Sequence, residues 1–185
     1  MPGGNTSPAR SSMAPSAVLG AGFTLLELLI TIAVLAILLA LAVPMFTSTI
    51  NNNRLSAQAN ELVTSLQLAN SEAVRRNARI TVCPSTDGAT CAASGPWTGW
   101  LTIVASNNEV LRSAITKPPL QVTSTVNSVT YRGDGLARDA TGALLVADFT
   151  VCIPTAQPAE NQRIVGMVSG SRISTTASNG AGACP

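Results

Sequence analysis

The hydrophobic residues of the first third of the chain form one long run. It covers residues 28–43 and has Thr31 as its polar interruption. The uninterrupted apolar part has about 16 to 19 residues, the lower edge of what spans a ~30 Å hydrocarbon core. The pattern predicts either a membrane helix or the apolar part of a secretory signal.

Three readings of this run are open, and two residues discriminate between them. Ala40-Leu41-Ala42 resembles a signal-peptidase site, which favours an ordinary signal, and the length also suits a passive single-pass anchor. However, Glu27 lies in the first turns of the apolar helix, where an ionised side chain costs several kcal/mol unless it is paired. Pro44, just past the supposed cut, would kink a continuing helix rather than begin a mature terminus. These residues favour a helix that continues and uses its glutamate.

A second apolar pattern follows the run and has the period of a helix. Its members are Leu55, Ala59, Leu62, Leu66, Ala69 and Ala73. They recur in alternating steps of four and three, an average period of about 3.6 residues. The sequence therefore predicts one helix from about residue 23 to residue 76, about 80 Å long. The first half would lie in lipid, and the second half under a globular head.

Short β-type runs separated by turn residues follow the predicted helix. They cover 80–83, 100–105, 110–115, 120–126, 129–132, 144–152, 163–168 and 172–175. A helix followed by strands predicts an α+β fold, with an antiparallel sheet packed on the second half of the helix. The expected organisation is a leader at 1–22, a transmembrane helix at 23–46, an amphipathic helix at 47–78 and a β-rich head at 79–185.

Four cysteines, all after the apolar run, suggest disulfides in an oxidising compartment. There is no CxxC pair and no histidine to complete a zinc site. Of the three connectivities we favour Cys83–Cys91 and Cys152–Cys184, a local loop and a clamp on the C-terminus. Loop closure gives these bonds roughly 2.6 and 3.7 kcal/mol. The tail from residue 178 is expected to be flexible unless Cys184 holds it.

Composition offers no catalytic or cofactor chemistry. The net charge is +2, so neither a polyanion-binding nor an acidic surface follows from it, and the absence of histidine removes the commonest general base. Gly133-Asp134-Gly135 is a turn rather than a phosphate loop, and Lys117 precedes a surface bend at Pro118. Trp97 and Trp100 flank a glycine at a strand entry, where a partly buried turn is the favoured role. We expect no enzyme, no metal and no cofactor.

The N-terminal motif resembles the type IV prepilins. The residues that carry the resemblance are Gly22-Phe23-Thr24-Leu25-Leu26-Glu27, the apolar run and Pro44. It implies that a prepilin peptidase cleaves after Gly22 and N-methylates Phe23. Residues 1–22 would then be a leader, which Met13 as an alternative start would shorten. Glu27 would pair with the amine of a neighbouring subunit, because a buried amine and a buried carboxylate are each costly alone and their pairing sets the register.

Later segments narrow the resemblance to the GspH/FimT group of minor pilins and pseudopilins. They are Asn52-Asn53-Arg54-Leu55, Ala59-Asn60-Glu61-Leu62-Val63, Ser71-Glu72-Ala73-Val74-Arg75-Arg76, Cys83-Pro84, Trp97-Thr98-Gly99-Trp100 and Val110-Leu111-Arg112. The resemblance implies a subunit of a type IV pilus or a type II secretion filament. Such a protein is held in the bacterial inner membrane with a periplasmic head, and its partners are other pilins or pseudopilins and the peptidase.

The same resemblance raises DNA binding as an alternative function. Some members of the FimT branch take part in DNA uptake through a C-terminal Gly-Arg-x-Arg motif. Here the comparable stretch reads Gly170-Ser171-Arg172-Ile173-Ser174, with one arginine where the pattern has two. Arg163 and Arg172, with Arg138 as a third candidate, are the cations that could converge. Because phosphate binding grows with the number of neutralised charges, we expect weak DNA binding at most.

Overall fold

The structure is a computed structural model that describes residues 22–185. The predicted leader, including Met13, lies outside the described residues apart from Gly22. The chain divides into two compact units, one ending at Ala40 and the other covering Leu41–Pro185.

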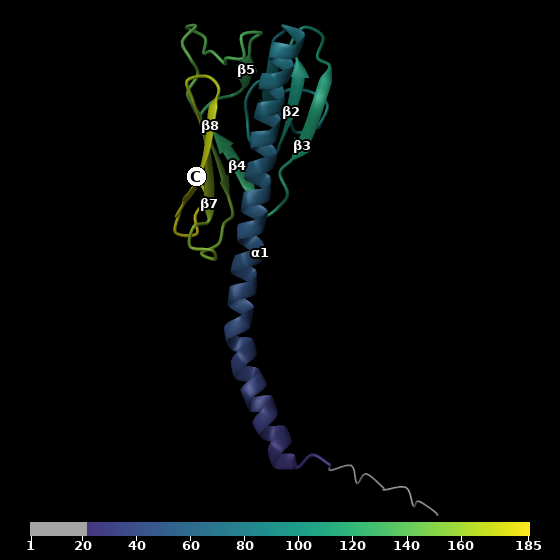
Figure 1. Ribbon diagram of the computed structural model, residues 1–185, viewed down its shortest axis with the longest axis vertical. Coiled ribbons are helices and arrows are strands. Elements are labelled where there is room, and N and C mark those ends of the chain that lie inside the picture. Colours follow the sequence, from purple (N-terminus) through teal and green to yellow (C-terminus); the bar gives the residue numbers. More distant parts are fainter. Residues whose placement is uncertain (1–21) are drawn as a thin grey trace, which may run out of the picture. The chain divides into compact units, whose positions relative to one another are not determined.

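The helix α1 covers Leu25–Arg76 and confirms the single long helix expected from the sequence (Figure 1). Thr24 caps its start, because the Thr24 hydroxyl accepts a hydrogen bond from the Glu27 N–H at 3.2 Å. Asn77, at a φ of 46°, ends it in the left-handed conformation that is common after helices. The helix is continuous through Pro44.

The last turn of α1 carries charges suited to a helix end. Arg75 and Arg76 lie there, where cations favour the helix dipole, and both donate to the Glu72 carboxylate. These hydrogen bonds lower the pKa of Glu72 to about 2. The position of these arginines at the end of the helix, together with their hydrogen bonds to Glu72, accounts for them without a partner molecule.

The apolar half of α1 meets the requirements for a membrane span. α1 is the one helix in the described part of the chain that is long and apolar enough to cross a membrane. Its side chains from Leu25 to Ala40 are exposed in the structure. Signal sequences share this length and composition, so the expected membrane boundary near residue 46 stays a prediction.

Eight strands form the head, as the sequence predicts. They are β1 (Ile80–Pro84), β2 (Gly99–Val104), β3 (Val110–Ile115), β4 (Gln121–Ser124), β5 (Val129–Tyr131), β6 (Ala147–Cys152), β7 (Gln162–Val168) and β8 (Arg172–Ser178). All pairings are antiparallel, in two four-stranded sheets of order β3-β2-β1-β5 and β4-β6-β7-β8 (Figure 1). The α+β fold class is confirmed, with two sheets in place of one.

The predicted strand 144–152 begins later than expected. Leu144 makes a single bridge to Arg138, and β6 starts at Ala147. The preceding turn explains the difference, because the Asp139 carboxylate accepts hydrogen bonds from the N–H groups of Thr141 and Ala143, at 2.9 and 3.0 Å. The chain therefore stays in a local turn until it reaches the sheet.

The core lies between α1 and the two sheets. The whole predicted stripe of α1, from Leu55 to Ala73, is buried. Trp100 packs there and donates its indole N–H to Ser65 Oγ at 2.9 Å. Trp97 is 3% exposed and meets Phe149 edge-on, with ring centroids 5.0 Å apart. Trp97 is thus a core residue, more deeply buried than the partly buried turn expected from the sequence.

Two disulfides fasten the head. Cys83 is joined to Cys91 and Cys152 to Cys184, the same two pairs that the sequence favours. The second bond holds the C-terminal tail, where the Ala183 carbonyl also accepts hydrogen bonds from the side chains of Asn161 and Gln162, each at 3.1 Å. The tail is therefore attached by a covalent bond and by hydrogen bonds.

Candidate functional site

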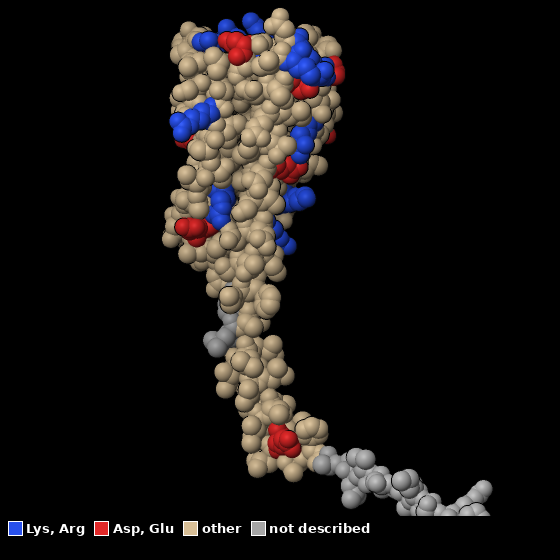
Figure 2. Space-filling model, in the orientation of Figure 1, with Lys and Arg blue, Asp and Glu red and all other residues tan. Residues whose placement is uncertain are grey.

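Glu27 is the one charged side chain between Phe23 and Asn53. It lies in the first turn of α1 among exposed apolar residues that include Leu26 and Leu28. The next charged residue along the helix is Arg54, about 40 Å away at 1.5 Å per residue. Figure 2 shows this part of the helix as an almost uniformly uncharged surface. No cation in the described part of α1 lies close to this carboxylate.

Gly22 and Phe23 precede the helix in an exposed segment. Both residues are exposed and lie outside α1, which begins at Leu25. A Cβ added at Gly22 would meet no atom within 4 Å. Packing within this chain therefore does not require a glycine here.

Pro44 lies in α1 close to the division between the two compact units. It has no N–H to donate to the carbonyl of residue 40, the last residue of the first unit. A turn that lacks this hydrogen bond is the place where a helix bends at least cost. The roles expected for Gly22, Phe23, Glu27 and Pro44 stay predictions.

The two arginines of the expected DNA contact are not brought together. Arg163 is paired with Ala177 on β8, five positions from Arg172. An odd separation places the two side chains on opposite faces of the sheet, about 17 Å apart along the strand. Arg163 donates to the carbonyls of Glu160 and Gln162 at 3.1 and 2.8 Å, and to Asn52 Oδ1 on α1. Arg138 is held by the Asp134 carboxylate at 3.4 Å.

This arrangement predicts weak DNA binding. We expect the purified chain to bind labelled duplex at or beyond the ~10⁻⁴ M end of the nonspecific range, with a shallow salt dependence. The measurement is a titration at two salt concentrations, with Arg172→Ala for comparison and Arg79→Ala, at an exposed position away from the sheet that carries Arg172, as a matched loss of charge. Micromolar binding that is lost in Arg172→Ala alone would make DNA capture a primary function.

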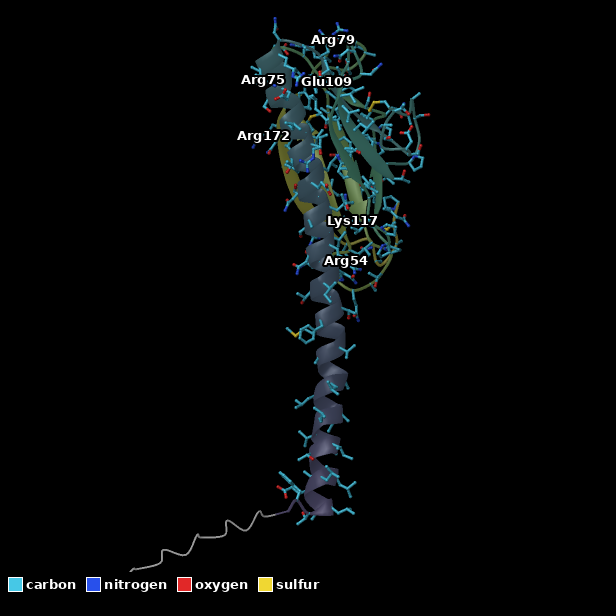
Figure 3. All side chains as sticks on the ribbon, turned by 90° about the vertical axis from the view of Figure 1, so that its right-hand side faces the viewer. Arg54, Arg75, Arg79, Glu109, Lys117 and Arg172 are labelled. Atoms are coloured by element: carbon cyan, nitrogen blue, oxygen red, sulfur yellow. A yellow bond between two sulfur atoms is a disulfide. The ribbon has the colours of Figure 1, made fainter. Side chains whose placement is uncertain are left out.

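The structure brings together two cations that the sequence did not connect, one on α1 and one on the segment after β3. Arg54 and Lys117 line one cleft, although the sequence placed the first off the apolar stripe and the second at a surface bend (Figure 3). They are 63 residues apart in the chain, so no local pattern could have joined them. Of the other labelled charges, Arg75, Arg79 and Glu109 lie near the C-terminal end of α1, and Arg172 lies below them in this view (Figure 3).

Within residues 22–185, no group of three or more Cys, Asp and Glu side chains is placed to hold a metal ion. The described residues present a helix whose apolar first half carries one carboxylate, and a head with two disulfides.

Comparison with known proteins identifies this arrangement. The family model described as "Type II transport protein GspH" matches residues 58–170, and the "Prokaryotic N-terminal methylation motif" matches residues 20–43. No curated protein matches the chain.

Solved structures of minor pilins share the fold. The type IV minor pilin FimU of Pseudomonas aeruginosa is similar in two crystal forms, at 20% and 21% identity, with TM-scores of 0.53 and 0.51. The matches cover 70% and 69% of this chain and 96% and 99% of FimU. The minor pseudopilin EpsH of the Vibrio cholerae type 2 secretion system matches at 12% identity and a TM-score of 0.49, over 67% of this chain and 97% of EpsH. With more than half of its length matched by the family model, the chain belongs to the GspH family of minor pilins and pseudopilins and carries the prepilin methylation motif.

Proposed function

We propose that this protein is a minor subunit of a type IV pilus or a type II secretion filament. It is made as a precursor, cut after Gly22 and methylated at Phe23. The apolar half of α1 then holds it in the bacterial inner membrane, with the head in the periplasm, until it is assembled. The observation that carries the proposal is the lone carboxylate of Glu27 in an uncharged helix segment, inside the methylation-motif match.

Assembly follows from the cost of that carboxylate. An ionised side chain in an apolar surrounding costs several kcal/mol when it is alone, and so does a buried terminal amine. Cleavage after Gly22 creates such an amine at Phe23, four residues before Glu27. When the amine of one subunit meets the Glu27 carboxylate of another, both costs fall together. Because apolar helices slide past each other without preference, this pairing fixes their axial register.

The head supplies a rigid body rather than chemistry. Its core closes around the second half of α1, and two disulfides fix its loop and its tail. Because the head is packed on the helix that enters the filament, filament growth would carry the head and the helix out of the membrane together. The GspH description favours a secretion filament and the FimU likeness suits a pilus, so the proposal covers both classes, which use one kind of subunit.

Cell fractionation tests this function. In cells that express the other subunits of its system, we expect the chain in the sheared filament fraction together with them. In cells that lack the prepilin peptidase, we expect the uncleaved chain in the membrane fraction only, because the amine that pairs with Glu27 is not produced. Recovery of the chain in the soluble secreted fraction, with none in filaments, would contradict the proposal.

A further inference from the structure

A cleft lies on the head between α1 and the connection from β3 to β4. Its volume is about 330 Å³, and its lining includes Arg54, Ala57, Gln58, Glu61 and Lys117. Figure 3 labels Arg54 and Lys117. The first four come from α1 and the last from the connection, so the cleft joins the helix to the β-rich part of the head.

A buried amide holds the two walls of the cleft together. Gln58 is 3% exposed. Its Oε1 accepts a hydrogen bond from the Lys117 backbone N–H at 3.4 Å, and its Nε2 donates to the Ile115 carbonyl at 3.5 Å. These contacts fix the backbone of Lys117 against the helix, so that its ammonium group shares the cleft with the Arg54 guanidinium.

The cleft carries an uncompensated positive charge. Neither Arg54 nor Lys117 forms an ion pair with any residue that the structure describes, whereas Arg75 and Arg76 both have the Glu72 carboxylate. The one acid of the lining, Glu61, already faces Arg112, with Oε1 and Nη2 3.8 Å apart. Two cations that share one cleft repel each other, and an anion placed between them would relieve this repulsion.

The exposed face of α1 beside the cleft lacks charge. Its members recur in steps of four and three and are all exposed: Asn53, Ala57, Asn60, Thr64, Gln67 and Ser71. Charged residues are depleted at the centres of protein interfaces and common at their edges. Ala57 belongs to both the stripe and the cleft, so the two features form one continuous surface on the helix that carries Glu27.

We propose that this cleft receives a carboxylate side chain of the neighbouring subunit in the filament. The inference rests on the proposed function, because it names a contact that assembly would make. A lipid phosphate is less well placed. Arg54 lies eight residues after the expected membrane boundary near residue 46, about 12 Å along the helix, while the headgroup layer extends only about 5–8 Å beyond the hydrocarbon.

Charge reversal in the full-length protein tests this contact. In Arg54→Glu/Lys117→Glu, a neighbouring carboxylate would meet two like charges, and we expect about a tenfold or greater loss of the chain from the filament fraction. The control, Arg79→Glu/Arg132→Glu, makes the same change of net charge away from the cleft and should assemble as the wild type does. Both variants should keep the mature N-terminus and both disulfides, which shows that they are processed and folded.

A photo-crosslinking residue at position 57 in otherwise wild-type chain identifies the occupant. We expect it to link to a companion subunit in assembled filaments, and the link should be lost in the double reversal. Crosslinks to lipid alone, or normal assembly of Arg54→Glu/Lys117→Glu, would overturn the inference and leave the proposed function intact. Absence of the wild-type chain from filaments would instead refute both.

Discussion

Glu27→Ala is expected to leave the protein in the membrane and to remove it from filaments. Insertion should be unchanged or improved, because the substitution removes an ionised side chain that is costly in an apolar helix segment unless it is paired. Assembly should fall about tenfold or more, because the amine of the partner subunit would be buried without a counter-charge. The measurement is the ratio of filament-bound to membrane-bound chain by immunoblot.

Two further variants test whether the charge of Glu27 is what matters, one at the same position and one a control nearby. Glu27→Gln keeps the size of the side chain and removes its charge, so it should lose assembly as Glu27→Ala does. Thr31→Ala lies one turn further along the same apolar segment, where the Thr31 hydroxyl only donates to the Leu28 carbonyl at 2.8 Å, and it should assemble normally. If Glu27→Gln or Glu27→Ala enters filaments at the wild-type level, the carboxylate does not set the register.

Loss of the Cys152–Cys184 bond is expected to destabilise the head more than loss of the Cys83–Cys91 bond. The two bonds close loops with sequence separations of 32 and 8 residues. Loop-closure entropy then gives losses of roughly 3.7 and 2.6 kcal/mol in the free energy of unfolding. The measurement is urea unfolding of Cys152→Ser/Cys184→Ser and of Cys83→Ser/Cys91→Ser, each as full-length chain in detergent.

The tail bond should also have the wider structural effect. Asn161 is fully buried, and its Nδ2 donates to the carbonyls of both Ile153 and Ala183. Without the bond at Cys184, the neighbouring Ala183 carbonyl could move away, and the buried Asn161 amide would lose one of its two carbonyl acceptors.

Peptide mapping of the oxidised wild type should recover the two expected pairs, and a crossed pairing would refute the connectivity. An equal loss of stability in the two variants would show that loop length does not set the ranking.

The parts of the molecule that could be predicted from sequence are those with local causes. The stripe from Leu55 to Ala73 repeats at the helical period, so its burial could be predicted without the sheets. The strands are bounded by turn residues, such as Asn108 and Gly135, that adopt the left-handed conformation. The prepilin motif is contiguous, so its residues could be recognised together.

The remaining features depend on contacts between distant parts of the chain. β1 pairs with β5, almost 50 residues later, and this pairing helps to set two sheets where one was expected. Likewise, the alternation that puts Arg163 and Arg172 on opposite faces needs the β7–β8 register, and the Arg54–Lys117 cleft needs the folded head. No sequence pattern specifies these contacts, because they arise only when the core is packed.

The mass of the mature N-terminal peptide tests the central claim most directly. Cleavage between Gly22 and Phe23 followed by methylation predicts a peptide that begins with N-methylphenylalanine at Phe23 and carries Glu27 unmodified. A mature chain that begins at Val43, after the Ala40-Leu41-Ala42 sequence, would lose the helix segment that holds Glu27. That result would make the protein an ordinary secreted one and contradict its assembly into a filament.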